Sequence, residues 1–228
     1  MRDRSGGGYV VIEGADGCGK TTQARRLARH LAEAGREVLH LREPGSTPLG
    51  EALRAVLLDP NSGELDVLSE ALAFSAARRE MLRREVEPAL RRGAVVVVER
   101  CFLSTVAYQC RAPLGARAPE DLVREVTTAL LGVARPDLVV VLDVGEDVAA
   151  ARLQAEGRRD RIEARPAAYH AAVRAAMRSF AAAESWCAAL LRRDGDAAGR
   201  SRIALVDGTR PIEAVATAVR AACEEWLA

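Results

Sequence analysis

A glycine-rich loop between an apolar run and a helical pattern limits the folds that this chain can adopt. Residues 14–21 read Gly-Ala-Asp-Gly-Cys-Gly-Lys-Thr, match the pattern Gly-x4-Gly-Lys-Ser/Thr, and follow the apolar run 9–12. The glycines let backbone amides turn inward, and the next helix adds its positive end, so the loop suits an anionic phosphate. A strand, this loop and a helix in that order predict an α/β protein that binds a nucleoside triphosphate.

Lys20 in this loop is the only lysine of the chain, although lysine and arginine together number 33. A bias in genome composition accounts for the general use of arginine, but not for the position of the remaining lysine. A compact ammonium on a flexible stem can reach phosphate oxygens. We therefore expect Lys20 to contact the outer phosphates and Thr21 to offer its hydroxyl to Mg²⁺.

Composition restricts the partners and the compartment. A chain of 228 residues with 49% hydrophobic content predicts one domain over residues 9–228, after a flexible tail of residues 1–8. A net charge of +1 supplies no field for nucleic acid or an anionic membrane. The start of the chain lacks the apolar core of a signal peptide, and no apolar run is long enough for a membrane span. Five cysteines without Cys-x-x-Cys spacing indicate neither a disulfide framework nor a zinc site, so we expect a cytoplasmic protein.

Short apolar runs alternate with longer helical patterns. The predicted buried parallel strands are 9–12, 38–41, 95–98, 138–142 and 203–206. The first predicted helix begins at Lys20, and further helices are predicted over 49–58, 66–92 with an interruption at Pro88, and 146–155. A long alanine-rich helix is predicted to run toward Arg193. The polar stretch 194–201 predicts a surface loop.

The phosphate loop alone does not distinguish a kinase from an ATPase, a switch or a regulatory module. The Asn-Lys-x-Asp motif that reads guanine needs a second lysine, which the chain lacks. The signatures of protein kinases are also missing. Two interpretations remain, which are phosphoryl transfer to a small acceptor and triphosphate hydrolysis coupled to another process.

Four further stretches, in order and spacing, resemble the thymidylate kinase family of P-loop nucleoside monophosphate kinases. They are Arg42-Glu43-Pro44-Gly45-Ser46-Thr47-Pro48, Phe74-Ser75-Ala76-Ala77-Arg78, the run from Glu99 to Gln109, and Asp160-Arg161-Ile162-Glu163. The resemblance covers residues 9–227 and implies a three-layer P-loop kinase fold with a five-stranded parallel sheet flanked by helices. It also implies Mg²⁺-assisted transfer of a phosphoryl group from ATP to dTMP, a homodimer, and a lid at about 156–165.

The resemblance implies two sets of ligand contacts. The residues that would bind ATP are Gly14, Ala15, Asp16, Gly17, Cys18, Gly19, Lys20, Thr21 and Thr22. The residues that would bind dTMP are Asp16, Glu43, Pro44, Phe74, Arg78, Arg100, Ser104, Thr105, Tyr108 and Gln109. By this resemblance Phe74 stacks on the thymine, Arg78 bonds the base, and Tyr108 disfavours a ribose 2′-hydroxyl. Without the resemblance, the residues themselves favour Phe74 and Tyr108 as core residues.

The resemblance also implies the catalytic and metal-binding residues. Lys20, Arg100 and the lid residues Arg158 and Arg159 would neutralise the transferring group, and the residues alone do not choose between the two lid arginines. Glu99 would hold Mg²⁺ through water, together with Thr21. Gly17 stands where some relatives carry a basic residue, so the lid would supply that missing charge.

The chain departs from the family pattern at three places, the first of which is Glu99-Arg100-Cys101, where glutamate replaces the more usual aspartate, keeps the charge and reaches one methylene farther. Cys101 stands where an aromatic residue or histidine more often follows the arginine, and we expect it to remove a ring from the acceptor pocket. Ser46 and Cys110 replace glycines, which raises the question of how those loops are shaped. Two alternatives to dTMP phosphorylation are therefore a kinase with another acceptor, such as dUMP, and a non-catalytic ATP-binding regulatory module. The three histidines are expected in packing or solvated roles; they are His30, His40 and His170.

Overall fold

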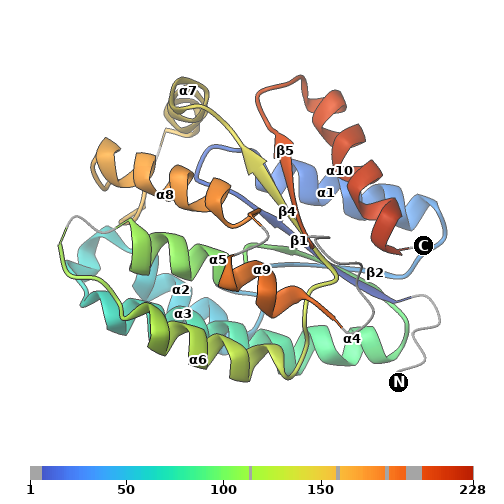
Figure 1. Ribbon diagram of the computed structural model, residues 1–228, viewed down its shortest axis with the longest axis horizontal. Coiled ribbons are helices and arrows are strands. Elements are labelled where there is room, and N and C mark those ends of the chain that lie inside the picture. The colour runs from blue at the N-terminus through green and yellow to red at the C-terminus, as the bar shows by residue number, and fades with distance from the viewer. Residues whose placement is uncertain (1–6, 113–114, 158–159, 183–184, 194–201, 228) are drawn as a thin grey trace.

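A twisted sheet of five parallel strands forms the centre of the protein (Figure 1). The computed structural model describes residues 7–112, 115–157, 160–182, 185–193 and 202–227. The strands are β1 (Gly8–Glu13), β2 (Val38–Arg42), β3 (Val95–Glu99), β4 (Leu138–Asp143) and β5 (Ile203–Asp207), in the spatial order β2-β3-β1-β4-β5. The five predicted strands and their parallel arrangement are confirmed. β1 begins inside the expected tail, because Gly8 pairs with Val95 of β3.

Helices cover both faces of this sheet, which gives the expected three layers. One face packs on α1 (Lys20–Glu33) and α10 (Ile212–Leu227), with α7 (Glu146–Glu156) at its edge. The helices over the other face include α3 (Val67–Met81), α5 (Phe102–Thr105), α6 (Glu120–Leu131), α8 (Ala167–Ser179) and α9 (Trp186–Leu191). Successive strand residues alternate between the two cores, as a period of two requires.

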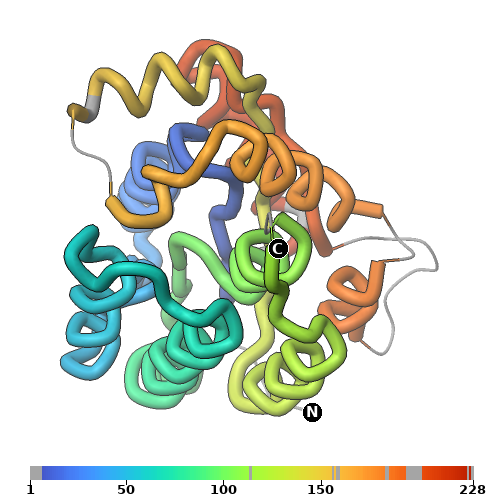
Figure 2. Tube along the Cα trace, turned by 90° about the vertical axis from the view of Figure 1, so that its left-hand side faces the viewer, coloured from blue at the N-terminus to red at the C-terminus, as the bar shows by residue number. Residues whose placement is uncertain are grey.

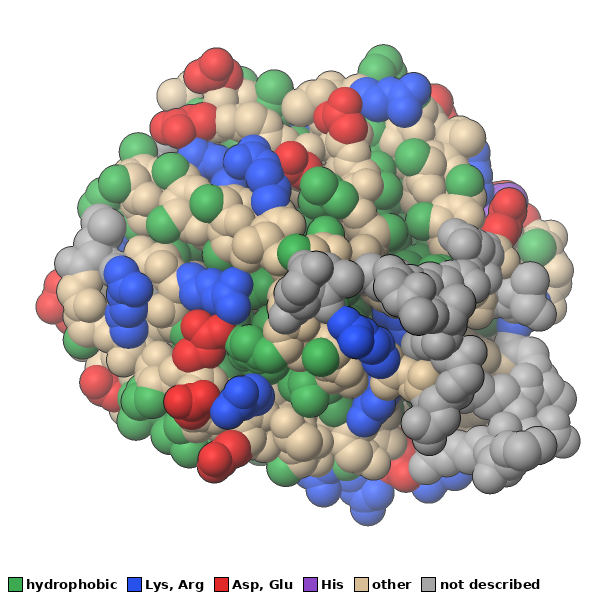
Figure 3. Space-filling model, viewed as in Figure 1, with side chains coloured by type: hydrophobic (Ala, Val, Ile, Leu, Met, Phe, Trp, Pro, Cys, Tyr) green, Lys and Arg blue, Asp and Glu red, His purple; other side chains and the backbone are tan. Residues whose placement is uncertain are grey.

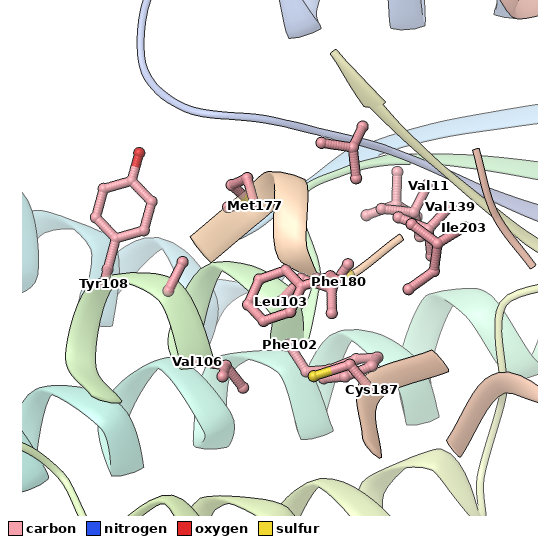
Figure 4. Close-up of a cluster of buried hydrophobic side chains, with 14 of the residues drawn as sticks. Val11, Phe102, Leu103, Val106, Tyr108, Val139, Met177, Phe180, Cys187 and Ile203 are labelled. Carbon is pink, nitrogen blue, oxygen red and sulfur yellow. The ribbon is translucent and has the colours of Figure 1, made fainter. Parts of the chain in front are cut away.

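The larger core shows how strands and helices meet. Val11, Val139 and Ile203 project from neighbouring strands toward Phe102 and Phe180 (Figure 4). Tyr108 lies at the edge of this cluster, and its hydroxyl points away from it (Figure 4). The ring therefore packs in the core while the polar tip remains available at the carboxyl edge of the sheet.

The crossover between β2 and β3 contains the two predicted helices. The first is α2 (Pro48–Leu58), and the second consists of α3, a π-helical turn (Leu82–Val86) and α4 (Glu87–Arg91). The amide of Glu87 bonds the carbonyl of Leu82, five residues back. The interruption expected at Pro88, which has no amide hydrogen to donate, thus takes the form of a wider turn directly before it.

The prediction of one long helix toward Arg193 is wrong. α8 ends at Ser179, and α9 occupies Trp186–Leu191. Phe180 is fully buried at the end of α8, and the Ser185 side chain accepts a hydrogen bond from the amide of Ala188 and so starts a new helix. Residues 194–201, predicted as a loop, lie outside the described residues.

The surface in Figure 3 carries acidic and basic side chains interspersed with one another. Within the described residues, no helix combines the length and the apolarity that crossing a bilayer requires. All five cysteines are buried and free.

Candidate active site

A cavity of about 750 Å³ lies at the carboxyl edge of the sheet, where the loops after the parallel strands converge. Most of the predicted site residues line it: Asp16, Gly17, Cys18, Gly19, Lys20, Thr21, Thr22, Glu43, Pro44, Phe74, Arg78, Glu99, Arg100, Ser104, Thr105, Tyr108 and Gln109. Gly14 and Ala15 do not line it, but their carbonyls accept hydrogen bonds from Lys20 Nζ at 3.0 and 2.8 Å. Arg158 and Arg159 lie outside the described residues.

The phosphate loop is shaped by glycines that have no room for a side chain. Gly14 has φ 140°, and a Cβ there would lie 2.6 Å from the carbonyl oxygen of Leu142. A Cβ on Gly17 would lie 2.5 Å from the carbonyl oxygen of Ala149 in α7. The packing of α7 on the loop therefore leaves no room for a side chain at Gly17.

Thr21 and Glu99 bring two oxygen groups together at the cavity. The Thr21 hydroxyl donates to Glu99 Oε2, and His40 Nε2 lies 3.0 Å from Glu99 Oε1. Burial opposes ionisation of Glu99, but the hydrogen bonds from His40 and Thr21 outweigh it and lower the pKa of the carboxyl. His40, which the sequence analysis assigned to packing or solvent, is thus the side chain that orients Glu99.

Arg100 and Tyr108 converge on Asp16 of the phosphate loop. Arg100 donates to Asp16 Oδ1 and, at 2.9 Å, to Ser104 Oγ, while the Tyr108 hydroxyl donates to Asp16 Oδ2 at 2.7 Å. Burial alone would raise the pKa of Asp16, but the charges of Arg100 and Lys20 hold it below its ordinary value. Arg100 has φ 71°, a backbone conformation that non-glycine residues adopt mainly where surrounding contacts enforce it, as at functional sites.

A buried ion pair forms the opposite wall of the cavity. Arg78 Nε donates to Glu43 Oε2 at 2.7 Å, and Arg78 Nη2 donates to Thr105 Oγ1 at 3.2 Å. Glu43 Oε1 and Arg78 Nη1 are buried and have no hydrogen-bond partner among the described residues. Phe74, one helical turn before Arg78, is half-buried, lines the cavity and belongs to neither core cluster.

Sequence reasoning missed Glu13, a carboxylate beneath the cavity. It is fully buried and accepts hydrogen bonds from the amides of Gly14, Cys101 and Ser104 at 2.9 to 3.0 Å. The Ser104 hydroxyl also donates to it at 3.0 Å. An acidic residue at the end of an otherwise apolar strand was the signal that could have identified it.

Arg152 is a second residue that sequence reasoning missed. Its guanidinium donates to the carbonyls of Gly17 and Cys18 at 3.3 Å and to that of Gly208 at 3.0 Å. It therefore connects the phosphate loop to the loop after β5. No local pattern distinguishes this arginine from the many others in the sequence.

The three departures from the family pattern have different consequences. Cys101 is buried in the larger core and does not line the cavity. Ser46 has φ 65°, and its hydroxyl bonds the amide and carbonyl of Arg42, which closes the turn. Cys110 lies in a π-helical turn (Val106–Arg111) and has no need of glycine.

A parallel sheet of this strand order, with a phosphate loop after its first strand and a cavity that continues past the loop, defines a P-loop kinase fold. A family model described as thymidylate kinase matches residues 12–191. A thymidylate kinase of Geobacter sulfurreducens is 36% identical over 219 residues, covering 93% of this chain and 94% of the relative. A thymidylate kinase of Thermomicrobium roseum is 40% identical over 96% of this chain and 95% of its own. A thymidylate kinase of Pseudomonas fluorescens is 42% identical over 77% of this chain and 82% of the relative. The chain belongs to the thymidylate kinase family.

Glu43 makes the stability of the protein depend on pH. Burial raises the pKa of Glu43 from 4.5 to about 7, although Arg78 opposes the shift. Between these two values the folded protein binds more protons than the unfolded chain, so the free energy of unfolding falls as the pH rises. We expect Glu43→Gln, which cannot ionise, to flatten this fall in urea denaturation at about pH 5 and about pH 7.5.

Glu51→Gln is the matched control. Glu51 is exposed, and its pKa is lowered by a hydrogen bond from the Ser46 amide and by Arg42 despite slight burial, so it stays ionised across this range. The free energy of unfolding of the Glu51 variant should change with pH by the same amount as that of the wild type. An equal change for the Glu43 variant would contradict the assignment.

Proposed function

We propose that this protein transfers the terminal phosphoryl group of ATP to the 5′-phosphate of dTMP, which yields ADP and dTDP. The observation that carries this proposal is the continuous cavity, which joins the phosphate loop to the wall formed by Phe74, Arg78 and Glu43. Membership of the thymidylate kinase family supports the same reaction.

The donor side of the cavity suits a triphosphate. Inward amides of the loop, the start of α1 and Lys20 would hold the phosphates of ATP. Arg152 lies at the same end and stabilises the loop through its carbonyls. The loop residues predicted from the sequence, from Gly14 to Thr22, are assigned to ATP on this basis.

The acceptor side suits a pyrimidine nucleotide. Phe74 would stack on the base, and the unpartnered atoms of Arg78 and Glu43 supply a donor and an acceptor beside it. The planar guanidinium of Arg100 suits the acceptor phosphate. Asp16, held by Arg100 and Tyr108, would accept a hydrogen bond from the sugar 3′-hydroxyl. The other assigned contacts to dTMP are Pro44, Ser104, Thr105 and Gln109.

Thr21 and Glu99 fit a magnesium ion. A hydroxyl and an ionised carboxylate are hard oxygen ligands, and they lie in hydrogen-bond contact at the cavity. The described residues contain no cluster of three or more His, Cys, Asp or Glu side chains that could hold a metal, which suits an ion held mainly by phosphate and water. An ion held there would neutralise part of the negative charge on the phosphates of ATP.

The residues act by positioning and charge. An oxygen of the dTMP phosphate attacks the terminal phosphorus of ATP, and the bond from that phosphorus to the bridging oxygen breaks, with no covalent enzyme intermediate. Lys20 and Arg100 hold the two phosphate groups in line and stabilise negative charge on the oxygens. We assign the remaining stabilisation to Arg158 or Arg159, as predicted from the sequence.

The proposed reaction predicts Mg²⁺-dependent release of ADP from ATP when dTMP is supplied. We expect dTMP to stimulate release far more than dUMP, dGMP, dCMP or UMP, with dTDP as the product. Lys20→Ala should lower kcat on the order of a hundredfold or more, because it removes a cation from the transferring group. A preference for another monophosphate would reassign the acceptor. ATP binding without stimulation by any monophosphate would favour the regulatory module.

The proposed stacking predicts a selective loss of acceptor affinity. Phe74→Leu should raise KM for dTMP about tenfold or more, because stacking on a base contributes about 1–3 kcal/mol. KM for ATP should stay close to that of the wild type. Arg79→Ala, an exposed change on the same helix, is the control. Equal KM values for dTMP in wild type and Phe74→Leu would remove Phe74 from the acceptor site.

We also propose a homodimer in the cytoplasm. Family membership supports the dimer, and neighbouring helices α2 and α3 expose Leu49, Val56 and Leu72. The five free cysteines fit a reducing compartment. Light scattering should give twice the mass of the 24.4 kDa chain, and Leu72→Glu should shift it toward that of one chain. A monomeric wild type would refute the dimer, and cell fractionation tests the compartment.

A further inference from the structure

Glu70 of α3 is a fully buried carboxylate to which neither the sequence analysis nor the proposed reaction gives a role. Its Oε1 accepts hydrogen bonds from Arg161 Nη1 at 2.6 Å and from Arg165 Nη2 at 2.7 Å. Its Oε2 accepts a hydrogen bond from Gln109 Nε2 at 3.2 Å. Glu70 lies one helical turn before Phe74 in α3, and its hydrogen bonds connect α3 to two other segments.

The first of these segments is the pocket arm, which we define as residues 160–165. The pocket arm forms part of the cavity wall through Asp160, Ile162 and Glu163. Asp160 Oδ1 accepts from the amides of Ile162 and Glu163, which closes the arm into a compact turn. Figure 2 shows the arm beside the helices that follow β2.

Arg161 attaches the pocket arm to the end of α2. Its amide donates to the carbonyl of Leu58 at 3.1 Å, and its Nε donates to that of Leu57 at 3.0 Å. The ion pair with Glu70 completes this attachment from the side of α3. The position of the arm is therefore fixed by α2 and α3, and the contact with α3 is the ion pair between Arg161 and the buried Glu70.

The second segment is the π-helical turn that carries Tyr108 and Gln109. Arg165 donates to the Tyr169 hydroxyl at 2.6 Å, and that hydroxyl donates to the carbonyl of Tyr108 at 2.8 Å. The hydroxyl of Tyr108 in turn bonds Asp16 in the phosphate loop. Hydrogen bonds thus run from Glu70 to the donor side of the cavity.

We propose that Glu70 is a positioning residue for phosphoryl transfer. Its carboxylate holds the pocket arm and the π-helical turn that carries Tyr108 in fixed positions relative to α3. The proposal rests on the proposed function, since Glu70 touches neither nucleotide. A buried carboxylate shared by two guanidinium groups is strongly coupled to both, and loss of its charge leaves two half-buried cations beside each other without a counter-charge.

A positioning role and a purely structural role predict different kinetics. Arg78 is held by its ion pair with Glu43 and not by Glu70, so dTMP should still bind when Glu70 loses its charge. A displaced cavity wall misaligns the reacting groups, and displacements of this kind lower the rate strongly. The expected signature is a fall in kcat with little change in dTMP affinity.

The experiment compares wild type with Glu70→Gln in kcat, in Kd for dTMP alone, and in amide hydrogen exchange of residues 160–165. All six amides of this arm donate hydrogen bonds, so loosening of the arm is observable without any reaction. We expect kcat to fall about tenfold or more and exchange in the arm to accelerate by a similar factor, while Kd for dTMP changes less than about threefold.

Glu87→Gln is the matched control. Glu87 is also buried and also accepts from two arginines, Arg83 at 2.6 Å and Arg91 at 3.0 Å, but it does not line the cavity. This variant makes the same chemical change and should leave kcat and exchange in the arm as in wild type. Equal kcat and exchange for wild type and Glu70→Gln would overturn the proposal, as would equal losses in both variants.

Arg165→Met covers the case in which Glu70→Gln fails to fold. It removes one of the two charges while Arg161 still pairs with Glu70. We expect an intermediate fall in kcat and a smaller acceleration of exchange in the arm. Unchanged values would overturn the proposal. A wild type that phosphorylates no monophosphate would refute the proposed function, whereas exchange in the arm would still report whether Glu70 holds it.

Discussion

One buried carboxylate, Glu13, fixes the relative position of two segments that line the cavity. Its two oxygens accept hydrogen bonds from Gly14 at the start of the phosphate loop and from Cys101 and Ser104 at the start of α5. The phosphate loop and the start of α5 are therefore fixed to the same side chain, and Arg100 donates to a residue of each segment, Asp16 and Ser104. The four donors satisfy a group whose burial would otherwise be costly.

Opposite charges in close pairs organise the rest of the site. Asp16 meets Arg100, Glu43 meets Arg78, and Glu70 meets Arg161 and Arg165. The planar guanidinium can bond several partners at once, so each arginine orients an acid and a second group together. A net charge near zero thus coexists with strong local fields, which is what binding two anionic nucleotides in one cavity requires.

Structural features that depend on a few neighbouring residues were predictable from the sequence. Apolar runs identified all five strands, because buried parallel strands need continuous hydrophobic residues. The phosphate loop was predictable because its backbone needs positive φ angles at Gly14, Gly17 and Gly19, which glycine adopts readily. The break between α8 and α9 was not, because burial of Phe180 against the sheet decides where the chain turns.

The sequence alone was enough to establish an α/β fold with a phosphate loop, and it suggested which motifs would meet an acceptor nucleotide. It contained no sign that Glu13 and Glu70 are shared by segments far apart in the chain, that His40 orients Glu99, or that Arg152 supports the phosphate loop. Those relationships arise only when parallel strands bring their carboxyl ends to one edge and helices close over it. Apart from the bond between Glu13 and its neighbour Gly14, these contacts join residues 39 to 135 positions apart, a separation at which no local pattern carries information.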